Sequence, residues 1–156
     1  MSRYDAATGV LIPVGDRIGI LDRKLRVVNE NTKQQDDWLR WTLKAFQSVY
    51  GYEFQGDSLL LARANLLLTF TEYLKVRWAR AATIDELNKI ADVISWNLWQ
   101  MDGLKCCPPF YEPAKENEQF CLFDISESKE ESADSMIYDW EAKATVPYKN
   151  LKKRER

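Results

Sequence analysis

The sequence predicts a helix-rich α+β fold with four main helices, one short strand and a C-terminal hairpin. Three observations predict it. Apolar residues recur at intervals of three and four over several long segments, which is the period of amphipathic helices. Glycines, prolines and capping residues separate these segments. Near the C-terminus, two β-prone runs flank a short polar segment, which is typical of a hairpin.

The first two helices are predicted on either side of a polar loop at residues 29–37. The first begins near Arg17. Its predicted inward face consists of Ile18, Leu21, Leu25 and Val28. Asp36 or Asp37 is expected to cap the second helix, which runs to about Tyr50. Its predicted inward face consists of Leu39, Leu43, Phe46, and Val49 or Tyr50.

The middle of the chain is predicted to hold a short strand and two further helices. Residues 51–54 are too short for a helix and read as the strand, after which Asp57 caps a long helix over about residues 58–79. That helix is apolar nearly all round at its start, so we expect neighbours on several sides. Thr83 and Glu86 match the capping box that opens the fourth helix. Its predicted inward face consists of Ile84, Leu87, Ile90, Ala91, Ile94 and Leu98.

We expect one compact domain with three parts: a helical body at residues 1–105, an acidic loop segment at 106–135, and a hairpin with a basic tail at 136–156. Residues 97–103 fit the end of the fourth helix or a short strand equally well, with Gly103 as a stop. An apolar island at residues 120–125 is expected to dock onto the body. Pro147 predicts that its strand lies at a sheet edge.

The composition excludes several classes of chemistry. The 156 residues contain no histidine, which removes Ser-His-Asp hydrolysis, Cys-His proteolysis and His-ligated zinc. The three cysteines match neither a disulfide framework nor a zinc spacing, so we expect no metal site and a reducing, cytoplasmic location. The start of the chain does not resemble a signal peptide. The longest apolar stretch, residues 59–68, contains Arg63 and Asn65, so no membrane span is expected.

Charge is distributed unevenly although the net charge is only −2. Residues 112–134 contain eight acids and two lysines, and residues 149–156 contain five basic residues and one acid. One interpretation is a solvated loop followed by an irregular tail. The alternative is a tail that contacts phosphates weakly. Similarly, the tryptophans that recur on the predicted helices are either core residues or a platform for stacked bases; they are Trp38, Trp41, Trp96 and Trp99.

Glu53 is the strongest local candidate for a binding residue. A carboxylate at the end of a short strand, directly before a helix, can accept hydrogen bonds from ribose hydroxyls, and the aromatic residue after it can flank a base. The alternative is that Glu53 is only a solvated acid at the end of a strand.

Three strings in the chain occur in the same order in a known family: SRYDAATG with IPVGDRIGILDRKLRVVNENT, then VYGYEFQGDSLLLARANLLLTF, then IADVISWNLWQMDGL. From about Ser2 to Leu104, and more loosely over residues 137–151, the chain resembles the central part of amino-methylating, N6-adenine-type DNA methyltransferase-like proteins of bacterial restriction–modification systems. The resemblance implies a truncated class I, Rossmann-like fold that binds S-adenosylmethionine. It implies that Glu53 holds the cofactor ribose, Phe54 lies beside the adenine and Asp102 faces the adenine amino group.

Two motifs of that family are missing. The Gly-rich turn that contacts the methionine part of the cofactor should stand just before Ser2, and the Asn/Asp-Pro-Pro-Tyr/Phe motif has no full match. The closest string runs from Cys107 through two prolines to Phe110, and its thiol is a weak acceptor for an amine. A turn that ends the preceding segment explains this string better. We therefore predict no catalytic residue in this chain and no methyl transfer by the chain alone; any enzyme activity would belong to a larger assembly.

Three functional hypotheses follow. The chain is a truncated or split methyltransferase-like subunit completed by a partner, a non-catalytic phage- or plasmid-borne relative that contacts protein or DNA and engages a restriction system, or a helical interaction protein related only by ancestry. The first predicts exposed apolar surface where the missing strand would pair, and the second predicts a sealed body. An open sheet edge favours association, so a protein partner or a homodimer is expected. DNA remains a possible partner.

Overall fold

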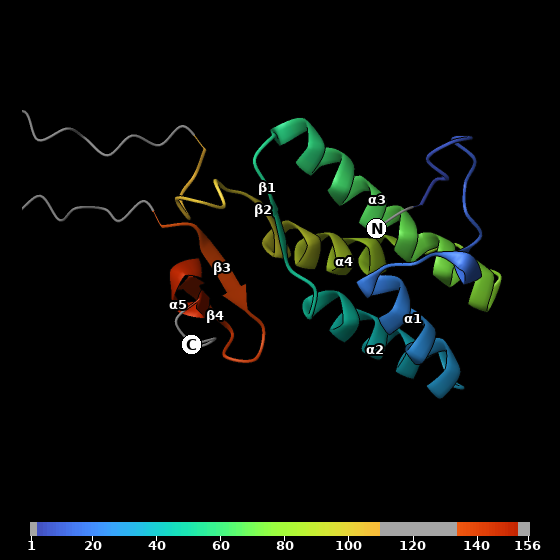
Figure 1. Ribbon diagram of the computed structural model, residues 1–156. Coiled ribbons are helices and arrows are strands. Elements are labelled where there is room, and N and C mark those ends of the chain that lie inside the picture. Colours follow the sequence, from blue (N-terminus) through green and yellow to red (C-terminus); the bar gives the residue numbers. More distant parts are fainter. Residues whose placement is uncertain (1–2, 110–133, 153–156) are drawn as a thin grey trace, which may run out of the picture.

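The computed structural model describes residues 3–109 and 134–152. Four helices form the body: α1 (Ile20–Asn31), α2 (Gln35–Gln47), α3 (Gly56–Trp78) and α4 (Ile84–Asn97). A 3₁₀ helix (Val14–Asp16) precedes them, and strands β1 (Gly51–Glu53) and β2 (Leu98–Gln100) lie beside them. The hairpin β3 (Met136–Asp139) and β4 (Ala144–Pro147) packs at the opposite end of the body from the N-terminal loop, with α5 (Tyr148–Lys152) (Figure 1). The predicted apolar island at residues 120–125 lies outside the described residues.

The helix-rich α+β class is confirmed, with its strands in two separate pairs. β1 and β2 are parallel, with Gly51 opposite Leu98 and Glu53 opposite Gln100. α3 and α4 together supply the crossover that parallel strands require. Because the strands are parallel, their carboxyl ends meet at one edge. α4 ends at Asn97 and β2 begins at the next residue, Leu98. Of the two interpretations of residues 97–103, the structure therefore favours the short strand.

Aromatic side chains fill the centre of the helical body. Trp38 is fully buried and its ring lies 6.3 Å from that of Phe70 and 6.5 Å from that of Trp78. Burying a large apolar side chain of this kind contributes about 1.5–3 kcal/mol. Trp38 is therefore core, as one interpretation predicted, whereas Trp41 and Trp96 are exposed.

The predicted capping box is confirmed at the start of α4, where Glu86 N–H donates to the Thr83 side chain and Thr83 N–H donates to the Glu86 carboxylate. The predicted caps of α2 and α3 are wrong. Gln34 and Gln55 occupy these N-cap positions, and the acids lie one to three residues inside each helix. There they face the partial positive charge of the helix N-terminus, which favours the same residue types without a capping bond.

Three predicted inward faces differ from the structure. α1 begins at Ile20 rather than near Arg17 because the Arg17 side chain is buried in an ion pair with Glu72, and Ile18 is left 73% exposed. On α2 the fully buried residues are Trp38, Thr42, Ala45 and Phe46, with Leu39 and Leu43 only half-buried. Ile84 is exposed at the first position of α4.

α3 has neighbours on several sides, as predicted, although the described residues leave one face of it exposed. Its inner face packs on α4, β1 and β2, and it lies along the upper border of the helices in Figure 1. Leu60, Leu61 and Leu68 are exposed on its outer face. None of the helices in the described ranges meets the length and hydrophobicity that crossing a membrane requires.

The predicted C-terminal hairpin is confirmed, with Met136 opposite Pro147 and Asp139 opposite Ala144. It joins the body through Ile137, which is buried, and through the Tyr50 hydroxyl, which donates to the Tyr138 carbonyl at 2.9 Å. The short helix α5 was not predicted; it starts where Tyr148 N–H donates to the Ser135 carbonyl at 2.8 Å.

Candidate functional site

The carboxyl ends of β1 and β2 bring the predicted cofactor residues to one edge of the sheet. Met101 N–H donates to the Glu53 carbonyl at 3.0 Å, so the parallel ladder continues one residue past β2. Asp102 follows immediately. On the other strand, Phe54 and Gln55 lead from Glu53 into the first turn of α3. Glu53, Phe54 and Asp102 therefore belong to one edge, although 48 residues separate Phe54 from Asp102 in the sequence.

The Glu53 carboxylate turns toward the start of α3. Its Oε1 atom accepts from the backbone N–H of Phe54 at 2.9 Å and from that of Gln55 at 3.4 Å. Among the described residues, none donates to the second oxygen, Oε2. Glu53 is half-buried, so this carboxylate is ordered by its own backbone and keeps one acceptor for a ligand.

Asp102 has a structural role of its own. Its Oδ1 atom accepts from Leu104 N–H at 2.9 Å and Lys105 N–H at 3.1 Å, which closes a tight turn. Hydrogen bonds from the backbone of Lys105 and Leu104 lower the pKa of Asp102. The backbone around it pairs with Cys107, whose carbonyl accepts from Asp102 N–H at 2.9 Å. The turn accounts for an acid at this position without any ligand.

An aromatic cluster of Tyr52, Trp99 and Tyr148 covers the strand pair and attaches α5 to it. The three ring centroids lie 5.5–6.1 Å apart. Gly103 permits this packing, because a Cβ atom there would lie 2.5 Å from a ring carbon of Tyr52. Close to the cluster, the Gln100 side chain donates to the Phe54 carbonyl at 3.0 Å and links the two strand ends.

Asn97 connects three parts of the structure and is 1% exposed. Its amide nitrogen donates to the carbonyls of Phe46, Gln47 and Val49 at 3.0–3.1 Å. Its oxygen accepts from the Trp140 indole at 2.7 Å. The Asn97 side chain thus supplies hydrogen-bond donors to carbonyls at the end of α2 and just before β1. It also attaches the hairpin to the helical body through the Trp140 indole. The sequence held a signal for it: a polar residue three after Ile94 on an otherwise apolar face.

A cavity of about 500 Å³ lies between the end of α2 and the hairpin. Tyr50 and Trp140 form aromatic walls, Ile137 and Val146 contribute apolar surface, and Asp139 with Glu141 supplies acids. Burial raises the pKa of Tyr50, and the negative charges of Asp139 and Glu141 raise it further. A second cavity of about 450 Å³ lies beside the start of β1, with Leu61 and Leu66 of α3 and Leu98 of β2 in its walls.

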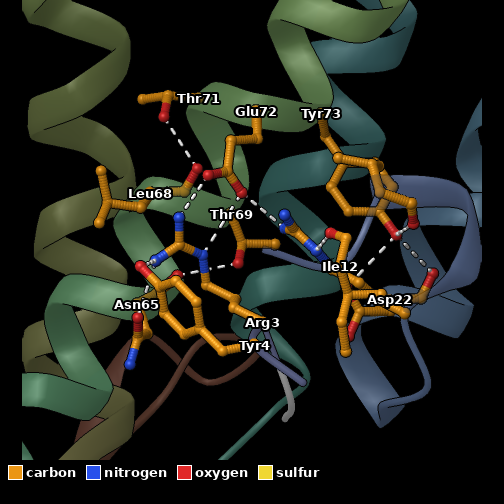
Figure 2. Close-up of polar contacts among 12 residues, drawn as sticks. Arg3, Tyr4, Ile12, Asp22, Asn65, Leu68, Thr69, Thr71, Glu72 and Tyr73 are labelled. Atoms are coloured by element: carbon orange, nitrogen blue, oxygen red, sulfur yellow. Dashed lines mark hydrogen bonds and ion pairs between the residues drawn. The ribbon is translucent and has the colours of Figure 1, made fainter. Parts of the chain in front are cut away.

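Figure 2 shows a polar cluster that ties the N-terminal segment to α3. Glu72 receives ion pairs from the buried guanidinium groups of Arg3 and Arg17, the latter at 2.6 Å. Burial opposes ionisation of Glu72, but hydrogen bonds from both arginines outweigh it and lower its pKa. Tyr73 donates to buried Asp22 at 3.3 Å, and burial together with the Asp22 charge raises the pKa of Tyr73 to about 12. These contacts explain the cluster as structural support.

Two of the predicted features lie at least partly outside the described residues. Phe110 of the Cys107–Phe110 string and most of the acidic segment lie outside the described residues. The thiols of Cys106 and Cys107 are buried beside the Asp102 turn. In residues 3–109 and 134–152, no three acids or cysteines come together in an arrangement that would hold a metal ion.

Comparison with models of protein families, with curated protein sequences and with solved structures finds no match to this chain.

Proposed function

We propose that the chain is a methyltransferase-like subunit associated with DNA modification or restriction–modification, which holds the nucleoside half of S-adenosylmethionine and requires a partner for catalysis. One observation carries the proposal: the parallel β1–β2 pair presents Glu53 at its carboxyl edge, immediately before α3. In parallel α/β arrangements, ligands bind outside the carboxyl ends of the strands. Together with α3 and α4, this pair is a candidate remnant of a Rossmann-like sheet.

The residues present fit part of the cofactor. Glu53 Oε2 is an acceptor suited to a ribose hydroxyl, and the exposed ring of Phe54 offers an apolar face for adenine. Asp102 fits less well because its Oδ1 atom already accepts two turn N–H groups. The bound cofactor would supply an electrophilic methyl group. The described residues offer no counterpart to the Gly-rich turn, so this chain's own contribution is limited to binding and orienting the nucleoside.

The surface beside β1 supports the requirement for a partner. β1 pairs with β2 on one side, and its other edge has no partner strand among the described residues. The cavity next to it has apolar walls from α3 and β2. Exposed apolar surface at this position is what the hypothesis of a split subunit expects, whereas a sealed body would have favoured the non-catalytic relative. An unpaired strand edge offers backbone groups with which a strand of another chain can pair.

Titration calorimetry of the purified chain with S-adenosylmethionine tests the proposal. We expect micromolar binding that weakens at least about tenfold in Glu53→Ala, since a hydrogen bond to a charged group contributes about 1.5–3 kcal/mol. Glu30→Ala, which changes an exposed acid on α1, is the matched control and should bind like the original chain. Absence of heat at millimolar ligand, or equal affinity in the two variants, would rule the nucleoside site out.

The alternative is a non-catalytic protein that contacts other proteins or DNA and engages a restriction system. The exposed leucines on the outer face of α3 favour it, because a face of this kind is suited to protein contact. Failure of the calorimetric test would leave this alternative as the better account.

A further inference from the structure

The outer face of α3 carries an apolar stripe with opposite charges at its two ends. Leu61 and Leu68 are 64% and 45% exposed, and Ala64 between them is exposed as well. Asp57 stands before them in the first turn of the helix and Lys75 stands after them in the last turn; both are exposed. We refer to Asp57, Leu61, Ala64, Leu68 and Lys75 as the α3 stripe.

Helix geometry aligns the stripe along one side of α3. Asp57 and Lys75 are 18 residues apart, which at about 100° per residue is five whole turns, so both point the same way. Leu61, Ala64 and Leu68 deviate from that line by no more than about 40°. The two charges are separated by about 27 Å along the axis at a rise of about 1.5 Å per residue. The apolar residues between them thus form a straight, uncovered band.

The pattern is complementary to itself. When two copies of α3 lie antiparallel across a two-fold axis, each Asp57 faces Lys75 of the other copy. The same arrangement places the small Ala64 opposite Leu68, so the larger side chain enters the space that the smaller one leaves. A two-fold contact of this kind uses the same surface on both chains and closes on itself. A parallel arrangement would instead place Asp57 against Asp57 and Lys75 against Lys75.

We propose that a second copy of this chain docks on the α3 stripe in antiparallel orientation. The dimer covers the outer leucines of α3, including Leu61, which also lines the cavity beside β1. It requires no cofactor, so the proposal goes beyond the nucleoside site and does not depend on it.

Sedimentation velocity of the full chain tests the contact. At about 100 μM, where a Kd of micromolar order gives mostly dimer, the original chain should sediment as a dimer. Leu61→Glu and Leu68→Glu should sediment as monomers because each places two carboxylates in the band. Leu104→Glu is the matched control, since Leu104 is 96% exposed and lies off α3, and it should remain dimeric. A monomeric original chain, or a dimer that persists in Leu68→Glu, overturns the proposal.

Charge exchange tests the orientation with variants that keep the apolar band. Asp57→Lys and Lys75→Asp each create two like-charge contacts in an antiparallel dimer, so each should raise the Kd about tenfold. The double exchange restores both contacts, and its Kd should return toward that of the original chain. In a parallel dimer each single exchange only replaces one like-charge contact by another, so unchanged Kd values for the single variants would overturn the antiparallel arrangement. Circular dichroism spectra identify any variant that does not fold.

Discussion

Replacing Asn97 with alanine tests the connection between the helical body and the hairpin. The substitution removes three hydrogen bonds to backbone carbonyls and leaves the Trp140 indole without its acceptor. The amide nitrogen has two hydrogens, so its three contacts with carbonyls amount to about two full hydrogen bonds, and the indole contact adds one. At a net 0.5–1.5 kcal/mol for each, we expect the free energy of unfolding to fall by about 3 kcal/mol. That is a large fraction of the 5–15 kcal/mol typical of a whole domain, roughly a fifth or more.

Urea unfolding followed by tryptophan fluorescence measures the loss, and hydrogen exchange locates it. Because Asn97 holds Trp140, amides of β3 and β4 should lose protection more than those of α3. Asn31→Ala is the matched control: Asn31 is exposed and its amide donates only to the Val27 carbonyl at 2.8 Å, so its removal should cost less than about 1 kcal/mol.

Asn97→Asp sharpens the same test. An aspartate keeps an acceptor for the indole but places a buried charge against three carbonyl oxygens, so at neutral pH it should destabilise at least as much as alanine. Lowering the pH protonates the new carboxyl group and should recover part of the stability. A loss below about 1 kcal/mol in Asn97→Ala, or identical protection of the hairpin in the variant and the original chain, would refute this reasoning.

Two further predictions concern the start of α4 and the turn at Gly103. The pKa of Glu86 is lowered to about 2, mainly by a hydrogen bond from Arg80. The ionised Glu86 side chain therefore stabilises the folded chain fully above the unfolded pKa of about 4.3, and this contribution to the free energy of unfolding is lost as the pH falls toward 2. Glu86→Gln should therefore be less stable than the original chain at pH 7, with a difference that shrinks in urea titrations near pH 2; a constant difference would contradict this. Gly103→Ala should cost about 1–3 kcal/mol through its contact with the Tyr52 ring, and Tyr52→Ser should relieve most of that cost. Strictly additive losses in the double variant would argue against the contact.

Much of the fold was predictable because its signals are local. The capping box at Thr83, the glycine-bounded strand at β1 and the β-prone runs of the hairpin each depend on a few neighbouring residues, and the structure confirms them. The helices were also found, with ends displaced by a few residues. Those displacements arise where tertiary contacts dominate, as at Arg17, whose ion pair with Glu72 keeps it out of α1.

The candidate site was less predictable because its parts meet only in three dimensions. Glu53 was recognised from its position after a strand, but its use of the Phe54 and Gln55 amides was not visible in sequence. Asp102 was interpreted as a ligand-facing acid, and the turn that engages it depends on the backbone of residues 104–105. The contacts of Tyr148 with Tyr52 and of Trp140 with Asn97 join segments more than 40 residues apart, so no local pattern could have paired these residues.

Nuclear magnetic resonance with ¹⁵N-labelled chain tests the central claim most directly, because it locates a ligand as well as detecting it. On titration with S-adenosylmethionine, we expect the amide shifts to concentrate at residues 53–56 and 100–105, the carboxyl edge of β1 and β2. Shifts confined to the cavity between α2 and the hairpin, around Tyr50 and Trp140, would contradict it, as would an unchanged spectrum at millimolar ligand.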